Sequence, residues 1–448
     1  MFAKILIANR GEIAVRIIRA CKEMGIQTVA VYSEADKDSL HVNLADESYC
    51  IGPAAAKDSY LNMAAILSVA DISGAQAIHP GYGLLSENAK FADLCKKCGV
   101  AFIGPEPEVI SRMGDKEEAR KTMIGAGVPV IPGSEILPTL QDALENAERI
   151  GYPLLIKARA GGGGRGIRIV NTRDEVEKAY HQASSEALSA FGDGGVYMEK
   201  RMYPVKHVEV QIIADHFGHV VALGERDCSV QRKNQKLIEE SPCAIVSPEL
   251  RKRMCETAIK AAASVHYTGV GTIEFLLDRD GNFYFMEMNT RLQVEHPVTE
   301  FVTGYDLVKW QIRIAAGREL DFTQEDIHVE GCAMECRINA DNAAKSASGI
   351  TLLHIPGGPW VRFDTAIYQD YKIPPFYDSM IGKLIVYSLS REESIRKMKA
   401  ALGELVIEGV ENNSQSQIDI LSDPDFVSGN YYTNFMERYE KFFQACEK

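Results

Sequence analysis

The sequence of 448 residues has no long hydrophobic run and no excess of positive charge. No stretch approaches the ~18 consecutive apolar residues of a membrane-spanning helix, so no membrane segment is expected. The opening residues, MFAKILIANRGE, pass straight into charged residues and lack the small-residue cleavage site of a signal peptide. The 49 basic and 62 acidic residues give a net charge of −13, which argues against a nucleic-acid-binding surface. An anionic ligand would therefore need basic residues gathered at one site.

The sequence also has no internal repeat and almost no paired cysteines. The ten cysteines are scattered, and only Cys95 and Cys98 have a spacing typical of metal or redox sites. No second pair accompanies them, which favours reduced structural thiols in a cytoplasmic protein. The remaining composition, with 46% apolar and 25% charged residues, is ordinary for a globular chain with two or three domains.

The chain is predicted to divide into four segments. Residues 1–112 alternate strand-like and helix-like patterns, which indicates an open parallel sheet covered by helices. Residues 113–130 form a linker, whose sequence RMGDKEEARKTMIGAG predicts one helix ended by glycines. Residues 131–203 form a small unit with strands at PLLIKA, GIRIV and GVYMEK, and residues 204–448 form a larger α+β body. The turn after the first strand, Asn9 to Glu12, lacks the three-glycine fingerprint of dinucleotide-binding folds.

Residues 271–290, GTIEFLLDRDGNFYFMEMNT, predict a β-hairpin with two opposed glutamates. If Asp280-Gly281 is a two-residue turn, Glu274 lies opposite Glu287, and Asn289 shares their face. Opposed carboxylates ~5 Å apart at Cβ repel each other, so they favour a cation between them. Two carboxylates and an amide oxygen suit Mg²⁺ held together with substrate phosphates. The alternative is a pair of solvated glutamates, and a three- or five-residue turn would shift the register.

The other face of this hairpin is predicted to be an apolar core face. The predicted pairs are Ile273 with Met288, Phe275 with Met286, and Leu277 with Tyr284. A charged pair on the opposite side of a buried sheet is costly without a counter-ion, which strengthens the metal interpretation.

The segment KARAGGGGRG predicts a flexible cover over phosphates. Its consecutive glycines, which include Gly163 and Gly164, expose backbone amides without obstruction by Cβ atoms. In a Walker A loop the lysine follows the glycines and a helix comes next, whereas here Lys157 precedes them and another strand, IRIV, follows. A strand–loop–strand order indicates a hinged lid, and Lys157 with Arg165 favours phosphate binding over a simple flexible loop.

Several motifs together resemble the ATP-grasp superfamily and, within it, biotin carboxylase. The superfamily motifs are Lys157 with its glycine loop, Glu199-Lys200, Glu274 and EMNTRLQVEHP. The biotin carboxylase motifs are NRGEIAVRIIRA, HPGYGLLSENA, GERDCSVQRKNQK and MECRINA. The resemblance covers essentially the whole chain. It implies a fold of α/β and α+β class, with an N-terminal open parallel sheet, a small mobile lid and a larger body that form an ATP-grasp fold.

The resemblance implies an ATP site between the lid and the body. Its expected residues are Lys116, Lys157, Gly163 and Gly164 at the phosphates, Glu199, Lys200 and Met202 around the adenine, and His207, Gln231 and Asn234 at the ribose and phosphates. Many relatives carry histidine at the position of Asn234, and asparagine keeps the hydrogen bonding but not the charge.

The resemblance also implies a metal site and sites for bicarbonate and biotin. The expected ligands of Mg²⁺, or Mn²⁺, are Glu274, Glu287 and Asn289, which agrees with the hairpin register. The expected bicarbonate residues are Lys236, Arg291, Gln293 and Val294, with Glu295 as the base, Arg337 as the stabiliser of the biotin enolate, and Tyr82 and Gly83 near the biotin pocket. The loop Ala343–Gly349, AAKSASG, is shorter than the proline-containing loop of relatives, which could alter the rim of the biotin site.

The implied activity is ATP- and bicarbonate-dependent carboxylation of biotin through carboxyphosphate. Biotin is expected on a separate carrier protein, because the nearest match to a Met-Lys-Met acceptor, at Lys399, lies in a predicted helix. The expected partners are the biotin carboxyl carrier protein, carboxyltransferase subunits of an acetyl-CoA carboxylase in fatty acid synthesis, and a second copy of the chain contacting through helices that include Arg19 and Glu23.

Three alternatives to this interpretation of the sequence remain open. The first is a role in another acyl-CoA or 2-oxoacid carboxylase, because another subunit chooses the acyl acceptor. The second is an ATP-grasp ligase that joins a carboxylate to an amine. The third is a nucleotide-binding regulator, which the full set of metal ligands, base and cations disfavours.

Overall fold

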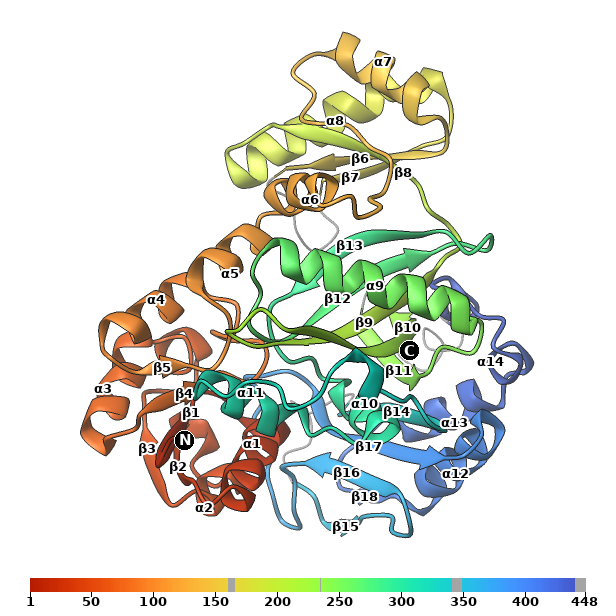
Figure 1. The fold of residues 1–448 in the computed structure, drawn as a ribbon. Coiled ribbons are helices and arrows are strands. Elements are labelled where there is room, and N and C mark those ends of the chain that lie inside the picture. Colours follow the sequence, from red (N-terminus) through yellow and green to blue (C-terminus); the bar gives the residue numbers. More distant parts are fainter. Residues whose placement is uncertain (160–165, 234, 341–348, 440–448) are drawn as a thin grey trace.

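The computed structural model describes residues 1–159, 166–233, 235–340 and 349–439 (Figure 1). The predicted phosphate-binding residues Gly163 and Gly164 and the predicted nucleotide contact Asn234 lie outside the described residues. All but the last residue of the loop 343–349 also lies outside them.

The N-terminal part forms an open parallel sheet, which confirms the prediction. Its strands follow the order β3-β2-β1-β4-β5, and each neighbouring pair is parallel. The central strand β1 is buried on both faces because its residues Ile5 to Ile7 are all apolar. The strands are β1 (Lys4–Ile7), β2 (Gln27–Tyr32), β3 (Glu47–Cys50), β4 (Ala77–His79) and β5 (Ala101–Phe102). The helices are α1 (Gly11–Glu23), α2 (Leu40–Leu44), α3 (Met63–Ser73) and α4 (Ala89–Lys97), with single 3₁₀ turns at Glu34–Asp36 and Ala56–Asp58.

The segment predicted as one helix, residues 112–127, is divided between two helices, so the prediction of one continuous helix is wrong. Helix α5 (Pro107–Gly114) ends before Asp115, and α6 (Lys116–Gly125) begins directly after it. Asp115 has an extended backbone, and its carboxylate accepts hydrogen bonds from the first-turn amides of α6, at 2.9 and 3.0 Å. Aspartate is a preferred N-cap residue, so the break follows from its side chain.

The lid is a small antiparallel sheet with two helices on one face, at the top of Figure 1. Its sheet order is β7-β6-β8, and the three predicted strands are confirmed. The strand–loop–strand order around residues 160–165 is therefore confirmed on both sides of the loop. The strands are β6 (Leu154–Ala158), β7 (Ile167–Val170) and β8 (Val196–Lys200), and the helices are α7 (Leu140–Ile150) and α8 (Val176–Phe191), the latter preceded by a 3₁₀ turn at Arg173–Glu175.

The body is built on one long antiparallel sheet with the order β13-β12-β9-β10-β11-β14-β17-β16. Helix α1 of the N-terminal part packs against β16 and β17, so the two parts share a boundary. The strands are β9 (Lys206–Ala214), β10 (Val220–Arg232), β11 (Gln235–Ser241), β12 (Gly269–Leu277), β13 (Phe283–Asn289), β14 (Cys332–Asn339), β16 (Val361–Thr365) and β17 (Met380–Ser388), with the separate pair β15 (Leu352–His354) and β18 (Val406–Glu408). The helices are α9 (Pro248–Ser264), α10 (His296–Thr303), α11 (Leu307–Ala315), α12 (Arg391–Glu404), α13 (Ser414–Ser422) and α14 (Pro424–Ser428), with 3₁₀ turns at Gln324–Asp326 and Phe435–Arg438.

The hairpin of β12 and β13 keeps Glu274 opposite Glu287, but not through the predicted turn. Leu277 pairs with Phe283, and the backbone amide of Asp278 donates to the carbonyl of Asn282 at 2.9 Å, so the turn has three residues, 279–281. That turn shifts the register by one residue. A β-bulge at Met286 shifts it back before the glutamates are reached.

The bulge also corrects the predicted core face of the hairpin. Phe285 and Phe283 pair with Phe275 and Leu277, and both phenylalanines are only 5% exposed. Met286 is 36% exposed instead, so its predicted place in the core is wrong. Tyr284 pairs with Leu276 rather than Leu277 and is half-buried.

Within the described residues, none of the helices combines the length and the apolar character that crossing a membrane requires. The cysteines in the described part of the chain are all free thiols. Cys95 is buried and Cys98 is exposed, and the structure does not bring this pair together with further metal-ligating side chains among the described residues.

Candidate functional site

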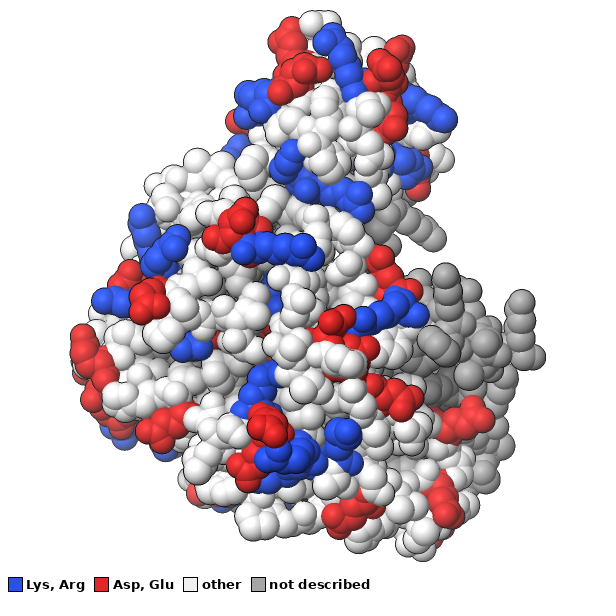
Figure 2. Space-filling view, turned by 90° about the vertical axis from the view of Figure 1, so that its right-hand side faces the viewer, with Lys and Arg blue, Asp and Glu red and all other residues white. Residues whose placement is uncertain are grey.

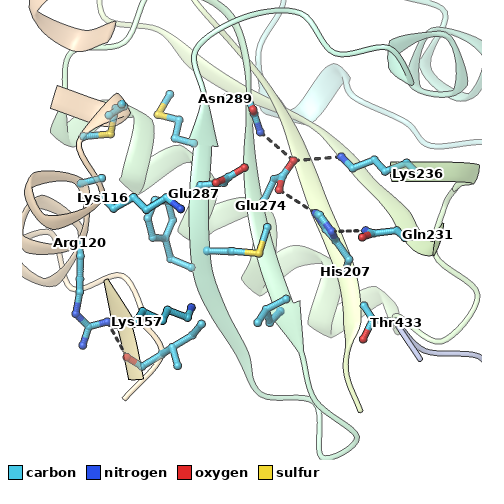
Figure 3. A pocket seen from close by; sticks show the side chains of 18 of the residues that line it. Lys116, Arg120, Lys157, His207, Gln231, Lys236, Glu274, Glu287, Asn289 and Thr433 are labelled. Carbon is cyan, nitrogen blue, oxygen red and sulfur yellow. Dashed lines mark hydrogen bonds and ion pairs between the residues drawn. The ribbon is translucent and has the colours of Figure 1, made fainter. Parts of the chain in front are cut away.

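A cavity of about 1470 Å³ lies between the lid, the linker helices and the body sheet. It gathers most of the predicted site residues from distant parts of the sequence (Figure 3). Those that line it are Lys116, Lys157, Glu199, Met202, His207, Gln231, Lys236, Glu274, Glu287, Asn289, Arg291, Gln293, Val294, Glu295 and Arg337. Acidic and basic side chains are interspersed on the outer face shown in Figure 2, and residues of both signs also line the cavity.

The lid side of the cavity carries two of the predicted phosphate-binding lysines. Lys157 on β6 forms an ion pair with Glu199 on the neighbouring strand β8. Lys116, the first residue of α6, extends toward Glu287 from the linker (Figure 3). Lys200 does not line the cavity, because its ammonium group donates to the carbonyl of Tyr152 at 2.9 Å.

Glu274 is the most heavily bonded side chain of the predicted metal site. Its Oε1 accepts from Asn289 at 2.9 Å, from Gln293 at 2.8 Å and from Lys236 at 3.1 Å. Its Oε2 lies 2.9 Å from Nε2 of His207, whose Nδ1 is 2.8 Å from the amide of Gln231. Burial opposes ionisation, but Lys236 and His207 outweigh it and hold the pKa of Glu274 well below its usual range.

The pKa of Glu287 is shifted in the opposite direction, upward. Burial raises the pKa of its carboxyl group, and the neighbouring charge of Glu274 raises it further, against the opposing effect of Lys116. A carboxylate held beside another in a half-buried cavity fits a divalent cation, which would supply the missing positive charge. Asn289 reaches Glu274 with its amide nitrogen while its oxygen accepts from Arg291 at 3.0 Å. A rotation of that amide would turn a third oxygen toward the two carboxylates.

At the inner end of the cavity, two cations hold the predicted base, Glu295. Lys236 donates to its Oε1 at 2.5 Å, and Arg337 donates to its Oε2 at 2.9 Å. Burial acts to raise the pKa of Glu295, but Lys236 and Arg337 hold it well below the usual value. Arg337 also contacts the buried Glu239 at 2.6 Å, and Lys236 contacts the buried Glu209 at 2.7 Å.

Two important side chains beneath the cavity were missed by the sequence analysis. Arg226 on β10 is fully buried and contacts Glu209 at 2.6 Å and Gln293 at 2.9 Å. A signal for Glu209 was present, because His207, Glu209 and Gln211 occupy alternate positions of one strand and share a face. Arg226 lies in the motif GERDCSVQRKNQK, but a fully buried arginine cannot be distinguished from an exposed one by that pattern.

The predicted biotin-pocket residues Tyr82 and Gly83 are both described, and neither lines the cavity. They follow β4 of the N-terminal part. The Tyr82 hydroxyl donates to Glu12, and the amide of Asn9 donates to the Tyr82 carbonyl at 2.8 Å. The cavity lining therefore includes Glu295 and Arg337 but neither Tyr82 nor Gly83.

Models of known protein families match nearly the whole chain. The biotin carboxylase N-terminal domain matches residues 1–110, and the biotin carboxylase C-terminal domain matches residues 335–438. Between them, the ATP-binding domain of the carbamoyl-phosphate synthase L chain matches residues 115–323.

Curated proteins and solved structures resemble the chain over the same extent. It is 55% identical to biotin carboxylase 1 of Bacillus subtilis, over 98% of this chain and 99% of that protein. The biotin carboxylase–beta-gamma-ATP complex from Campylobacter jejuni matches with a TM-score of 0.92 and 50% identity, over 98% of this chain and 99% of that one. The biotin carboxylase subunit of pyruvate carboxylase matches with a TM-score of 0.87 and 49% identity, over 99% of both chains.

A further solved structure adds a bound anion to these comparisons. It is the biotin carboxylase domain dimer of the 2-oxoglutarate carboxylase from Hydrogenobacter thermophilus, in complex with MgADP, ADP and bicarbonate. It matches with a TM-score of 0.90 and 48% identity, over 99% of both chains. The relatives thus share one architecture, while their names include two different 2-oxoacids, pyruvate and 2-oxoglutarate.

Proposed function

Because this chain belongs to the biotin carboxylase family, whose members are ATP-dependent ligases, we propose that it carboxylates carrier-bound biotin as the first half-reaction of an acetyl-CoA carboxylase. One observation carries the chemical assignment: a buried carboxylate, Glu295, lies between Lys236 at 2.5 Å and Arg337 at 2.9 Å. This arrangement offers a base and two cations at one point of a cavity whose other end carries Lys116 and Lys157.

ATP would lie between the lid and the body. Lys116 and Lys157 would contact its phosphates, with Gly163 and Gly164 as the cover and Asn234 as a further contact. The backbone of Glu199 to Met202 would hold the adenine, with the Lys200 side chain turned outward. His207 and Gln231 would orient the ribose and phosphates through their mutual hydrogen bond. Mg²⁺ or Mn²⁺ held by Glu274, Glu287 and Asn289 would neutralise charge on the phosphate oxygens.

Bicarbonate would bind near Lys236, Arg291 and the backbone of Val294, with Gln293 orienting that segment. Glu295 would remove the bicarbonate proton, so that the resulting oxygen attacks the γ-phosphorus and ADP leaves. Accepting the proton neutralises Glu295 and weakens its hold on Arg337. The guanidinium would then be free to face the biotin ureido oxygen.

Carboxyphosphate would decompose to CO₂ and phosphate within the cavity, and a lid that covers the cavity would exclude water. The phosphate would take the proton from the ureido nitrogen, and the enolate would attack CO₂ to give carboxybiotin. Arg337 would stabilise the negative charge on the ureido oxygen. Tyr82 and Gly83 would border the biotin from the N-terminal side.

The test is ADP release measured with and without bicarbonate and free biotin. Release that rises with bicarbonate, and carboxybiotin that forms when biotin is added, would support the proposal. Turnover that requires an amine instead of biotin would favour a different ATP-grasp ligase. A turnover rate that does not depend on bicarbonate would refute the assignment.

The proposal also names the molecule that finally accepts the carboxyl group. The curated relative biotin carboxylase 1 names no 2-oxoacid, and for this chain we propose the acetyl-CoA carboxylase role in fatty acid synthesis. A 2-oxoacid acceptor is the second candidate, because the similar structures also include domains of a pyruvate carboxylase and of a 2-oxoglutarate carboxylase. The tagged chain, purified from its own cells with bound partners, should fix labelled bicarbonate into acetyl-CoA rather than into pyruvate or 2-oxoglutarate.

The assembly is also part of the proposal. A biotin carboxyl carrier protein would deliver biotin, carboxyltransferase subunits would use it, and the complex would work in the cytoplasm. A homodimer is supported by the dimer of the Hydrogenobacter domain. We keep Arg19 and Glu23 on α1 as candidate contacts, although Glu23 also pairs with Lys309 of its own chain at 2.6 Å.

The domain limits remain a proposal of the same kind. We propose an N-terminal domain over residues 1–112, a linker over 113–130, a lid over 131–203 and a body over 204–448. Separate sheets for the N-terminal part, the lid and the body support these limits.

A further inference from the structure

We propose that Lys383 is a positioning residue for the carboxylation reaction. It fixes the backbone of the 293–295 segment, defined as Gln293, Val294 and Glu295, and ties that segment to the N-terminal part of the chain. The inference rests on the proposed function, because that function assigns the 293–295 segment to bicarbonate. The assignment of Lys383 itself comes from its contacts in the structure.

The Lys383 side chain is fully buried, and its ammonium group has two polar neighbours at close range. Its Nζ donates to the carbonyl oxygen of Val294 at 2.5 Å and lies 3.4 Å from Oε1 of Glu12. A buried ammonium group is costly unless such partners compensate it. The nearby carboxylate of Asp364 is already paired with Arg362, at 2.9 and 2.6 Å. Lys383 is therefore directed at the Val294 backbone.

The position of Lys383 in the sheet places it beside Arg337. The two residues are directly paired on β17 and β14. Arg337 holds the side chain of Glu295, while Lys383 holds the backbone of the preceding residue, Val294. Neighbouring cations on one sheet thus contact consecutive residues of one segment.

The 293–295 segment lies between β13 and α10, where the carbonyls of Gln293 and Glu295 accept long backbone hydrogen bonds of 3.3 Å from His296 and Val298. Gln293 is held at its side chain by Arg226 at 2.9 Å and by Glu274 at 2.8 Å. Glu295 is held at its side chain by Lys236 and Arg337. Val294 has an apolar side chain, so its contact with Lys383 is made through the carbonyl. Loss of Lys383 would release the middle of the segment.

Lys383 also connects the segment to the predicted biotin side of the site. Glu12 lies in the first turn of α1 and accepts a hydrogen bond from the Tyr82 hydroxyl. Nζ of Lys383 is 5.8 Å from the centre of the Tyr82 ring. The chain of contacts from Tyr82 through Glu12 and Lys383 to Val294 therefore crosses from the N-terminal part to the body. A displacement of Tyr82 or Glu12 would therefore change the position of Lys383 and, through it, the backbone of Val294.

The test compares Lys383→Met with wild type in ATP cleavage that depends on bicarbonate, without biotin. Methionine keeps the length of the side chain and removes its donors. We expect kcat/KM for bicarbonate to fall by ~10²-fold, the effect of a misplacement of about 1 Å, while KM for ATP changes less than about twofold. Lys383→Arg, which keeps charge and donors, should recover part of the loss.

Lys206→Met is the matched control. Lys206 is also a fully buried lysine of the body, but it pairs with Asp227 at 2.7 Å and does not line the cavity. The Lys206→Met variant should lose stability without a selective rise in KM for bicarbonate. An equal loss in both methionine variants would overturn the proposal, because any buried charge would then suffice. Unchanged kcat/KM for bicarbonate in folded Lys383→Met would also overturn it.

If Lys383→Met does not fold, the Glu12→Gln variant tests the proposed connection between Tyr82, Lys383 and Val294. Glutamine keeps the shape and removes the charge between Lys383 and Tyr82. We expect carboxybiotin formation to fall at least about fivefold more than ATP cleavage without biotin, and equal effects would overturn the link. Wild-type protein is assayed first, and a wild type without bicarbonate-dependent ATP cleavage would instead count against the proposed function.

Discussion

Replacing Arg337 with glutamine should separate the two halves of the proposed reaction. The guanidinium touches Glu295 at 2.9 Å and Glu239 at 2.6 Å, so it could act on the base, on the biotin enolate, or on both. Lys236 remains bonded to Glu295 after the substitution. Because Arg337 helps to hold the pKa of Glu295 low, its loss leaves Glu295 a stronger base rather than a weaker one.

The magnitude follows from these contacts. Loss of a donor to a developing oxyanion costs ~10²–10³-fold in rate, or about 3–4 kcal/mol. We therefore expect carboxybiotin formation by Arg337→Gln to fall by ~10²-fold or more. ATP cleavage that depends on bicarbonate, measured without biotin, should stay within about threefold of wild type, because the base and Lys236 are intact. The assays are ADP release without biotin and carboxybiotin yield with it.

Arg391→Gln is the control for the stability cost. Arg391 pairs with the buried Glu240 at 2.7 Å, and its side chain is 18% exposed, against 16% for Arg337. Removing one partner of a buried ion pair costs about 3–5 kcal/mol, so urea unfolding should show a similar loss of stability in both variants. Only Arg337→Gln should lose carboxybiotin. If ATP cleavage and carboxybiotin formation fell in equal proportion in Arg337→Gln, the division of roles would be refuted.

Three further substitutions test other parts of the site and the fold. Glu295→Gln should suppress bicarbonate-dependent ATP cleavage without biotin by ~10²–10⁴-fold, as loss of a general base does, and a near-normal rate would rule out that role. Glu287→Gln should lower turnover by roughly two or more orders of magnitude at saturating Mg²⁺ with an unchanged circular dichroism spectrum, whereas unchanged turnover would remove it from the metal site. Burial lowers the pKa of His41 to about 4, against the opposing effect of Asp36, so the unfolded chain takes up this proton first as the pH falls below ~6.5. The free energy of unfolding should then drop by about 2 kcal/mol between pH 7 and 5, and urea titrations of His41→Gln should lack that part of the drop.

The hairpin shows how a correct pairing of two residues can come from an incorrect local prediction. Asp280-Gly281 indicated a two-residue turn, but Asp278 accepts hydrogen bonds from the loop amides and stabilises three residues instead. The bulge at Met286 then restores the pairing of Glu274 with Glu287. Nothing in the alternation of apolar residues marks that bulge, because Phe285 and Met286 are both apolar. The sequence could therefore predict the opposed glutamates, while the core-facing residues required the structure.

The linker and the lid show the same limit at the level of helices. The strand-like patterns around Lys157 were strong enough to predict the lid sheet. The break at Asp115 was missed, because the charged residues after it continue a helical pattern. Its signal was the aspartate itself, which caps α6.

The charges beneath the cavity show how an acidic chain gathers cations at one point. Each of the two cations that hold Glu295 at the inner end also contacts a buried carboxylate: Lys236 with Glu209, and Arg337 with Glu239. In the proposed reaction, an entering bicarbonate would compete with Glu295 for Lys236, and the competition would end when Glu295 takes the bicarbonate proton. Sequence patterns indicated the cations and the base, because those residues belong to recognisable motifs. They could not indicate which carboxylate balances which cation, because Glu209 and Glu239 come from strands that meet only in the folded sheet. The low pKa of Glu295 therefore depends on long-range pairing as much as on its own motif.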